Sequence, residues 1–100
     1  MIYLIFYDIE NDRLRKKIAD KLIEYGYERL QLSVFAGPEN PKGIAGLWQT
    51  LKKLVVSGKG EGDKLYALRV DRSSFKKMLR MGKGRLDISY ICGEQHTVIC

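Results

Sequence analysis

The sequence predicts an α+β sandwich of the ferredoxin-like kind, with element order βαββαβ and two helices on one face of an antiparallel sheet. Two observations predict it. Strand-like and helix-like segments alternate along the chain, and glycine or proline marks most of their boundaries. The length of 100 residues favours one domain spanning residues 1–100. We expect its core within about residues 1–72 and a C-terminal extension over residues 73–100.

The first strand is predicted over residues 2–9, where apolar side chains occupy both faces of the run. Asp8 stands at its end, near water, where a hard cation or a phosphate can reach a carboxylate. The rival interpretation is that Asp8 accepts amide hydrogens at the start of the next helix. The residues alone do not decide between these two roles.

A first helix is predicted next, capped by Asn11 or Asp12 and ended by Gly26. Apolar residues recur along it at helical spacing, and Arg15 lies at the rim of that stripe. Most of its basic residues lie on the side away from the stripe: Arg13, Lys16, Lys17 and Lys21. Residues 27–37 then alternate between apolar and polar side chains, which predicts either one bent strand or a tight hairpin.

The second helix is predicted from the Asn40 cap and Pro41 at its first position to Ser57, with a broad apolar face. The glycine-rich residues 58–62 lack the GxxxxGK[ST] pattern of a nucleotide-binding loop and are interpreted as a linker to a strand over residues 64–70.

Beyond Asp71 the pattern weakens. Residues 73–81 predict a short helix with three apolar side chains directed inward: Phe75, Met78 and Leu79. Residues 86–92 alternate like a strand, and residues 97–100 form a further candidate strand.

The charge favours a polyanionic partner. Lys and Arg number 18 against 12 Asp and Glu, giving a net charge of +6, so nucleic acid is the leading partner. We expect no membrane partner and a cytoplasmic location, because no apolar stretch approaches the roughly 20 residues that span a bilayer. Cys92 and Cys100 lack the spacing of a metal finger and are expected to be free thiols, and His96 has no partner spaced for a catalytic triad.

The first strand also predicts a dimer. Since both of its faces are apolar, the sheet face without helices needs a cover, and a twofold homodimer is the commonest solution for a small chain. If the two sheets face each other, two copies of Asp8 can converge.

Three segments together resemble the small CRISPR-associated endonuclease family, the second of the two universal CRISPR adaptation proteins. They are the opening YLIFYDI, the helix beginning at Leu14-Arg15, and YERLQLSVFAG over residues 27–37. The resemblance implies a ferredoxin-like fold with a break at Gln31–Ser33, and a homodimer whose C-terminal strands lie across the partner's sheet. Family members are described as metal-dependent nucleases of RNA or DNA, and as non-catalytic hubs that join integrase dimers and bind the DNA being inserted.

The resemblance also assigns site residues. It matches Asp8 to the catalytic, metal-binding aspartate and Ser33 to the serine of the Q-x-S-V-F segment. Around the presumed cleft it places one aromatic and three basic residues: Arg15, Lys17, Arg29 and Phe35. Many relatives carry an acid where this chain has Ala36, so a carboxylate is missing there.

These residues predict a Mg²⁺ or Mn²⁺ site, because Mg²⁺ favours few carboxylates together with waters and substrate phosphates. Asp8 from each protomer would hold the cation, while Arg15, Lys17 and Arg29 hold phosphates. Phe35 would stack on a base or pack in the interface. A calcium EF-hand starting at Asp8 is rejected, since its sixth and twelfth positions lack the required glycine and glutamate.

The predicted function is therefore a CRISPR adaptation protein that binds RNA or DNA and cleaves it with a divalent metal, most simply as an endoribonuclease. Two alternatives stay open: a non-catalytic scaffold that joins dimers of the spacer integrase, and a toxin-like ribonuclease of similar fold.

Overall fold

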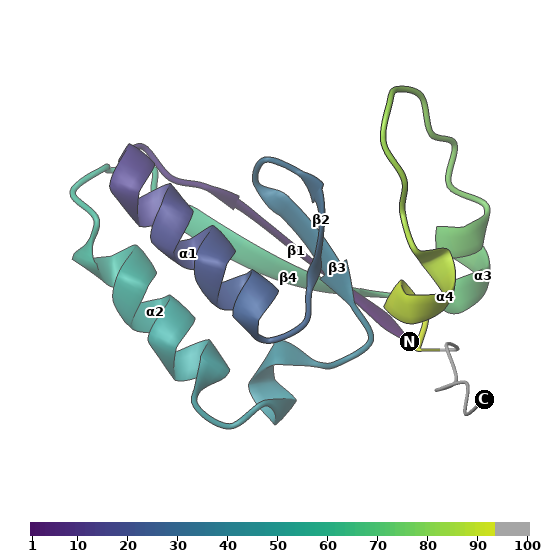
Figure 1. Ribbon diagram of the computed structural model, residues 1–100. Coiled ribbons are helices and arrows are strands. Elements are labelled where there is room, and N and C mark those ends of the chain that lie inside the picture. Colours follow the sequence, from purple (N-terminus) through teal and green to yellow (C-terminus); the bar gives the residue numbers. More distant parts are fainter. Residues whose placement is uncertain (94–100) are drawn as a thin grey trace.

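The computed structural model describes residues 1–93, and its sheet confirms the ferredoxin-like prediction. The elements are β1 (Ile2–Asp8), α1 (Asp12–Glu24), β2 (Glu28–Gln31), β3 (Val34–Gly37), the 3₁₀ turn η1 (Pro41–Gly43), α2 (Leu47–Ser57), β4 (Lys64–Val70), α3 (Arg72–Lys76) and α4 (Ile88–Ile91). The strands are antiparallel in the order β2-β3-β1-β4, and α1 and α2 lie together over the sheet (Figure 1).

The main core lies between the sheet and the two long helices. Its fully or almost fully buried members are Ile5, Tyr7, Ile9, Leu14, Ile18, Ala19, Leu22, Tyr27, Phe35, Leu47 and Leu51. In β1 these are the odd-numbered residues, because successive side chains of a strand point to opposite faces. The even-numbered residues of β1 therefore define the other face, which we call the open face.

The C-terminal segment covers one end of the open face. Phe75, Ile91 and Cys92 bury themselves against Ile2 and Ala36 in a second, smaller core. The Tyr90 hydroxyl also donates a hydrogen bond to the Gly26 carbonyl at 2.5 Å, which fixes α4 to the end of α1. The chain thus covers part of the face that the sequence assigned to a dimer partner.

Apolar side chains further along the open face remain exposed or half-buried. Phe6 and Tyr66 pair across β1 and β4 with ring centroids 5.5 Å apart, and Leu68 follows on β4. Tyr66 is 54% exposed and Leu68 is 51% exposed. The need for a cover, inferred from the two-faced first strand, thus persists at this end of the sheet.

Residues 27–37, predicted as either a bent strand or a tight hairpin, form a hairpin. β2 and β3 pair with a register shift between Arg29 and Gln31, and the chain turns at Leu32 and Ser33. The predicted strand over residues 64–70 is confirmed as β4.

The second helix starts later than the sequence predicted. Asn40 does cap a turn, accepting a hydrogen bond from the Lys42 amide at 3.0 Å, but this turn is the short η1. Gly46 then adopts φ +81°, a left-handed conformation that interrupts the helix and that glycine tolerates best. Regular α-helix begins only at Leu47 and ends at Ser57, where the sequence predicted its end.

The prediction of a strand over residues 86–92 is wrong, because this segment contains helix α4. Asp87 caps it by accepting a hydrogen bond from the Tyr90 amide at 3.0 Å. The consecutive residues Ile91 and Cys92 are both buried, which a helical turn permits and an alternating strand does not.

The helix predicted over residues 73–81 is also shorter than expected, since α3 ends at Lys76. Phe75 points inward as predicted, but Met78 is 37% and Leu79 is 97% exposed. Cys92 is a free, buried thiol, whereas His96, Cys100 and the candidate strand over 97–100 lie outside the described residues. No helix among residues 1–93 is long and apolar enough to cross a membrane.

Candidate active site

Asp8 is the last residue of β1 and lies on the open face, in line with Leu4 and Phe6. Its side chain is exposed, and no residue in the described part of the chain forms a hydrogen bond or ion pair with it. The cap of α1 is Asn11, whose Oδ1 accepts from the Leu14 amide at 2.9 Å. The capping role considered for Asp8 is therefore wrong, and its carboxylate is available to a ligand.

The loop after Asp8 is held from the side of α1 by Arg15. The Arg15 Nη1 donates hydrogen bonds to the carbonyl oxygens of Ile9 at 2.8 Å and Glu10 at 3.2 Å. The same guanidinium forms an ion pair with Asp12. Arg15 thus acts on the backbone that follows Asp8, and a phosphate would compete with these contacts for its N–H groups.

Asp63 holds the same loop from the side of β4. Its Oδ1 accepts a hydrogen bond from the Glu10 amide at 3.0 Å, while its Oδ2 is buried without a partner among the described residues. Gly58 and Gly60 make room for this carboxylate, because a Cβ at either position would collide with it. The glycine-rich linker therefore encloses a side chain that fixes the backbone near Asp8.

The sequence analysis placed Arg29 and Phe35 around the same cleft as Asp8, but in the structure they lie on the other face of the sheet. They face each other across β2 and β3 on the helix side of the sheet, with the Arg29 Cζ 5.2 Å from the ring centroid. Phe35 is completely buried and stacks on Tyr7, with ring centroids 6.2 Å apart. Neither a base nor a second copy has access to this ring, so both predicted roles, stacking on a base and packing in the interface, are wrong and Phe35 is a core residue.

The Tyr7 hydroxyl lies near Arg29, Ser33 and Arg15. Burial raises its pKa, and these three side chains partly offset that increase. Ser33 is half-buried in the hairpin turn, and its carbonyl accepts a hydrogen bond from the Tyr7 amide at 3.1 Å. Ser33 and Arg29 therefore support the end of β1 from the hairpin.

Lys17, the remaining residue predicted to bind phosphate, lies on α1 with its side chain exposed.

Known proteins resemble this chain in sequence and in fold. The family model for CRISPR associated protein Cas2 matches residues 1–78. The chain belongs to the Cas2 family. It is 38% identical over 82 residues to the "CRISPR-associated endoribonuclease Cas2 2" of Pyrobaculum aerophilum, covering 82% of this chain and 87% of that protein. It is 34% identical over 83 residues to the "CRISPR-associated endoribonuclease Cas2" of Aeropyrum pernix, with the same two coverages.

Solved structures agree on the fold of this Cas2 family member. Streptococcus pyogenes Cas2 superimposes with a TM-score of 0.65 at 18% identity, covering 82% of this chain and all of the other. A hypothetical protein of Thermus thermophilus superimposes with a TM-score of 0.64 at 30% identity, covering 85% and 94%.

Two residues near Asp8 escaped the sequence analysis. Lys64 stands directly opposite Asp8 in the β1–β4 register, on the same face of the sheet. Asp63 reaches Glu10 across 53 positions of sequence. The pairing of β1 with β4 in a ferredoxin-like sheet was the available signal for Lys64, because it sets the end of one strand beside the start of the other.

The fit to a divalent metal depends on Asp8. Within residues 1–93 no three His, Cys, Asp or Glu side chains come together to hold a metal ion. Asp8 nevertheless offers an exposed oxygen ligand without a side-chain partner, which is the type that Mg²⁺ and Mn²⁺ prefer. One chain thus supplies one carboxylate, and this fits a cation that keeps several waters and shares its site with a second copy.

Proposed function

We propose that this Cas2 family member is a metal-dependent endoribonuclease of the CRISPR adaptation stage and acts as a cytoplasmic homodimer. The observation that carries the proposal is the exposed Asp8 carboxylate, which has no side-chain partner among the described residues and lies on a face that is still partly uncovered. The Pyrobaculum and Aeropyrum relatives are both named as endoribonucleases, which supports ribonuclease chemistry.

The apolar remainder of the open face supports the dimer. Tyr66 and Leu68 are about half exposed next to Phe6, and a second copy of the sheet would remove them from water. A twofold axis over this area repeats the same contact on both chains. Because Asp8 lies on the same face as Phe6, such packing brings the two aspartates toward one another.

The chain's own groups then have distinct tasks. Asp8 holds the cation, Lys64 attracts a substrate phosphate to the same end of the sheet, and Arg15 and Asp63 fix the loop that follows Asp8. When bound, the cation supplies a Lewis acid and lowers the pKa of a bound water, as hydrolysis of a phosphodiester requires. Arg29 stabilises the hairpin through its hydrogen bond to the Leu32 carbonyl and has no direct role at Asp8.

The test is cleavage of a labelled RNA in Mg²⁺ by wild type and by Asp8→Asn, which preserves side-chain size. We expect Asp8→Asn to fold and dimerise normally and to lose about 100-fold or more in rate, since it removes the charge that holds the cation. Glu61→Gln, an exposed change in the glycine-rich linker, serves as the matched control. Equal cleavage by wild type and Asp8→Asn would refute the enzymatic role.

A second candidate is a non-catalytic scaffold that binds DNA and the spacer integrase. One observation favours it: the six cations of residues 72–85 equal the net charge of the whole chain, and Asp8 lies outside that segment. This distribution suits a protein that binds a polyanion without cutting it. Under this alternative, Asp8→Asn leaves spacer integration intact, so an integration assay with that variant separates the two roles.

A further inference from the structure

Lys64 is the basic residue that the fold places next to Asp8. In the antiparallel pairing of β1 with β4, the two residues stand directly opposite one another on the open face. Residues paired in this way have Cβ atoms about 4.5–5.5 Å apart. Both side chains are exposed, and within residues 1–93 neither forms a hydrogen bond or ion pair with another side chain. Asp8 and Lys64 therefore act on each other through their charges, at short range.

Arg15, the other cation near the end of β1, is engaged elsewhere. It donates a hydrogen bond to the Ile9 carbonyl at 2.8 Å and pairs with Asp12. Lys64 has a long, flexible stem and no such partner in the described part of the chain. Because β4 is an edge strand, no neighbouring strand restricts Lys64 on its outer side. Its ammonium group can therefore move between Asp8 and a ligand that approaches Asp8.

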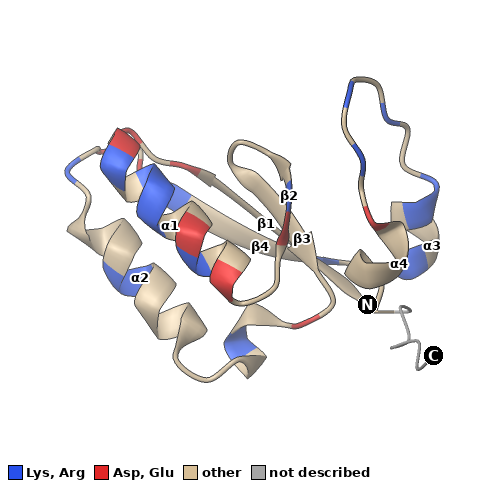
Figure 2. Cartoon of the chain, viewed as in Figure 1, with Lys and Arg blue, Asp and Glu red and all other residues tan. Residues whose placement is uncertain are grey.

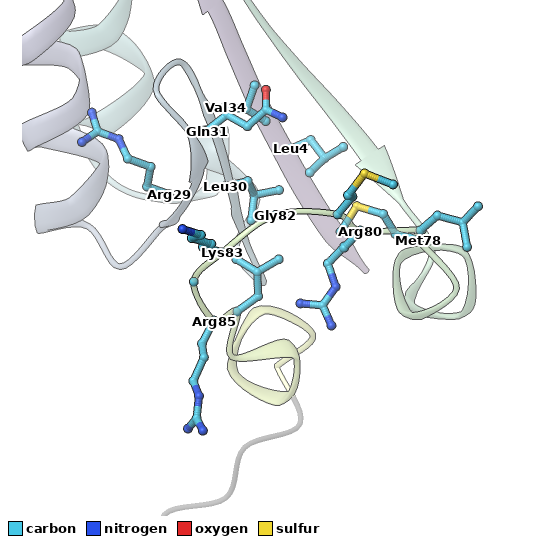
Figure 3. Close-up of a pocket in the computed structure, with 14 residues that line it drawn as sticks. Leu4, Arg29, Leu30, Gln31, Val34, Met78, Arg80, Gly82, Lys83 and Arg85 are labelled. Carbon is cyan, nitrogen blue, oxygen red and sulfur yellow. The ribbon is translucent and has the colours of Figure 1, made fainter.

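The basic segment of residues 72–85 lies further from Asp8. It follows the end of β4 that stands opposite the start of β1, and Figure 2 shows its cations along α3 and the next loop. Three of them line a cleft that reaches Leu4 on the open face (Figure 3): Arg80, Lys83 and Arg85. Leu4 precedes Asp8 by four residues, or about 13 Å at the usual rise of a strand. This exceeds the screening length of about 8 Å at physiological salt, so Lys64 dominates the charge next to Asp8.

The proposed dimer brings two such pairs together. A second copy on the open face places two Asp8 and two Lys64 at the shared site, since the same register holds in both chains. Without a metal, the two converging carboxylates repel each other and the lysines offset their charge. With a divalent cation between the carboxylates, the lysines repel the cation, and the site as a whole becomes positively charged. Such a site attracts a phosphate.

We propose that Lys64 is an exchangeable counter-ion of Asp8. It offsets the carboxylate while no metal is bound, and it binds a substrate phosphate once a cation occupies Asp8. The inference rests on the proposed function, because it takes Asp8 as the metal ligand. It adds that the metal and the substrate support each other's binding. A phosphate that draws Lys64 away strengthens the site for the cation, and the cation strengthens the site for the phosphate by the same factor.

The test measures the binding of metal and of nucleic acid, and neither assay requires cleavage. Isothermal titration of Mn²⁺ is recorded without nucleic acid. Fluorescence anisotropy in Mn²⁺ uses a labelled single-stranded DNA of 12 nucleotides, which carries phosphates but lacks the ribose 2′-hydroxyl. The variant is Lys64→Gln, and Lys64→Arg retains the charge. Arg69→Gln is the matched control, because it removes one cation from an exposed position of the same strand on the opposite face.

We expect Lys64→Gln to shift the two affinities in opposite directions. Loss of a positive charge close to the cation should lower the Kd for Mn²⁺ about 3- to 10-fold. The same variant should raise the Kd for the DNA about threefold or more, and reduce the slope of log K against log salt by about 0.7 for each lost phosphate contact. Lys64→Arg should behave like wild type in both assays, and Arg69→Gln should change the Mn²⁺ affinity only slightly.

Other results would overturn the inference. An unchanged Mn²⁺ affinity in Lys64→Gln, with binding still lost in Asp8→Asn, would exclude the counter-ion role and leave the metal site standing. Equal shifts in Arg69→Gln would show an effect of net charge alone. Weaker binding of both ligands by Lys64→Gln would show that Lys64 supports the local structure instead.

Failure of the proposed function gives a different result. Mn²⁺ binding that persists in Asp8→Asn would refute the metal site itself, and the role of Lys64 with it. An inactive wild type that still binds Mn²⁺ through Asp8 would refute the proposed enzyme and leave the role of Lys64 intact.

Discussion

The Asp63 carboxylate, just before β4, accepts a hydrogen bond from the backbone that follows Asp8. The variant Asp63→Ala tests how much this hydrogen bond contributes to stability and to catalysis. The substitution removes the acceptor that lies 3.0 Å from the Glu10 amide. A hydrogen bond to a charged group contributes about 1.5–3 kcal/mol. The lower end applies because the Glu10 amide can bond to water instead, and because alanine also removes the unpartnered Oδ2.

We therefore expect Asp63→Ala to lose about 1.5 kcal/mol of unfolding free energy, or about 6–12 °C in melting temperature for a domain of this size. The expected effect on catalysis is larger, because a displacement of about 1 Å at a reacting group can cost 100-fold. Urea unfolding measures the first quantity, and the rate of RNA cleavage in Mg²⁺ measures the second.

Glu61→Ala is the matched control, since it removes an exposed carboxylate from the same glycine-rich linker. It should leave both the unfolding free energy and the cleavage rate near the wild-type values. If Asp63→Ala behaved like Glu61→Ala in both assays, the role assigned to Asp63 in positioning the loop after Asp8 would be refuted.

Three further predictions follow from buried and interfacial groups. Phe35→Ala should lose about 3–5 kcal/mol in urea unfolding because it empties a fully buried site, and a loss below about 1 kcal/mol would contradict its place in the core. Tyr66→Ser combined with Leu68→Ser should shift the sedimentation coefficient toward the monomer, and an unchanged dimer would place the interface elsewhere. Burial raises the pKa of Tyr27 above its usual value of 10, so the neutral phenol stabilises the fold below pH 10 and this contribution is lost as the pH rises further. Tyr27→Phe should therefore lose less unfolding free energy above pH 10 than wild type does. An equal loss in both proteins would contradict this prediction.

The sequence was sufficient for the sheet and its two long helices because their patterns repeat over many residues. Leu14, Ile18 and Leu22 recur at helical spacing, and all three are buried as expected. Asp8 was identifiable for a different reason. A polar residue at the end of an apolar strand reaches solvent whatever the details of packing.

Short segments were less predictable because a few contacts decide them. Alternation over residues 86–92 predicted a strand, but the Asp87 cap and the burial of Ile91 beside Cys92 produce a helical turn. The faces of Arg29 and Phe35 depend on the register shift between β2 and β3, which no local pattern shows. The hydrogen bonds of Arg15 to the loop carbonyls depend on how a long side chain folds back. The resemblance could not show this, and it therefore predicted that Arg15 holds a phosphate.

The central claim is that two Asp8 carboxylates share one divalent cation, and metal stoichiometry tests it most directly. Isothermal titration of Mn²⁺ into the wild-type protein should give one tightly bound ion for two chains, and Asp8→Asn should abolish that binding event. The double variant Tyr66→Ser, Leu68→Ser should weaken it, because it separates the chains. One ion for each chain, or binding unchanged in Asp8→Asn, would contradict the account.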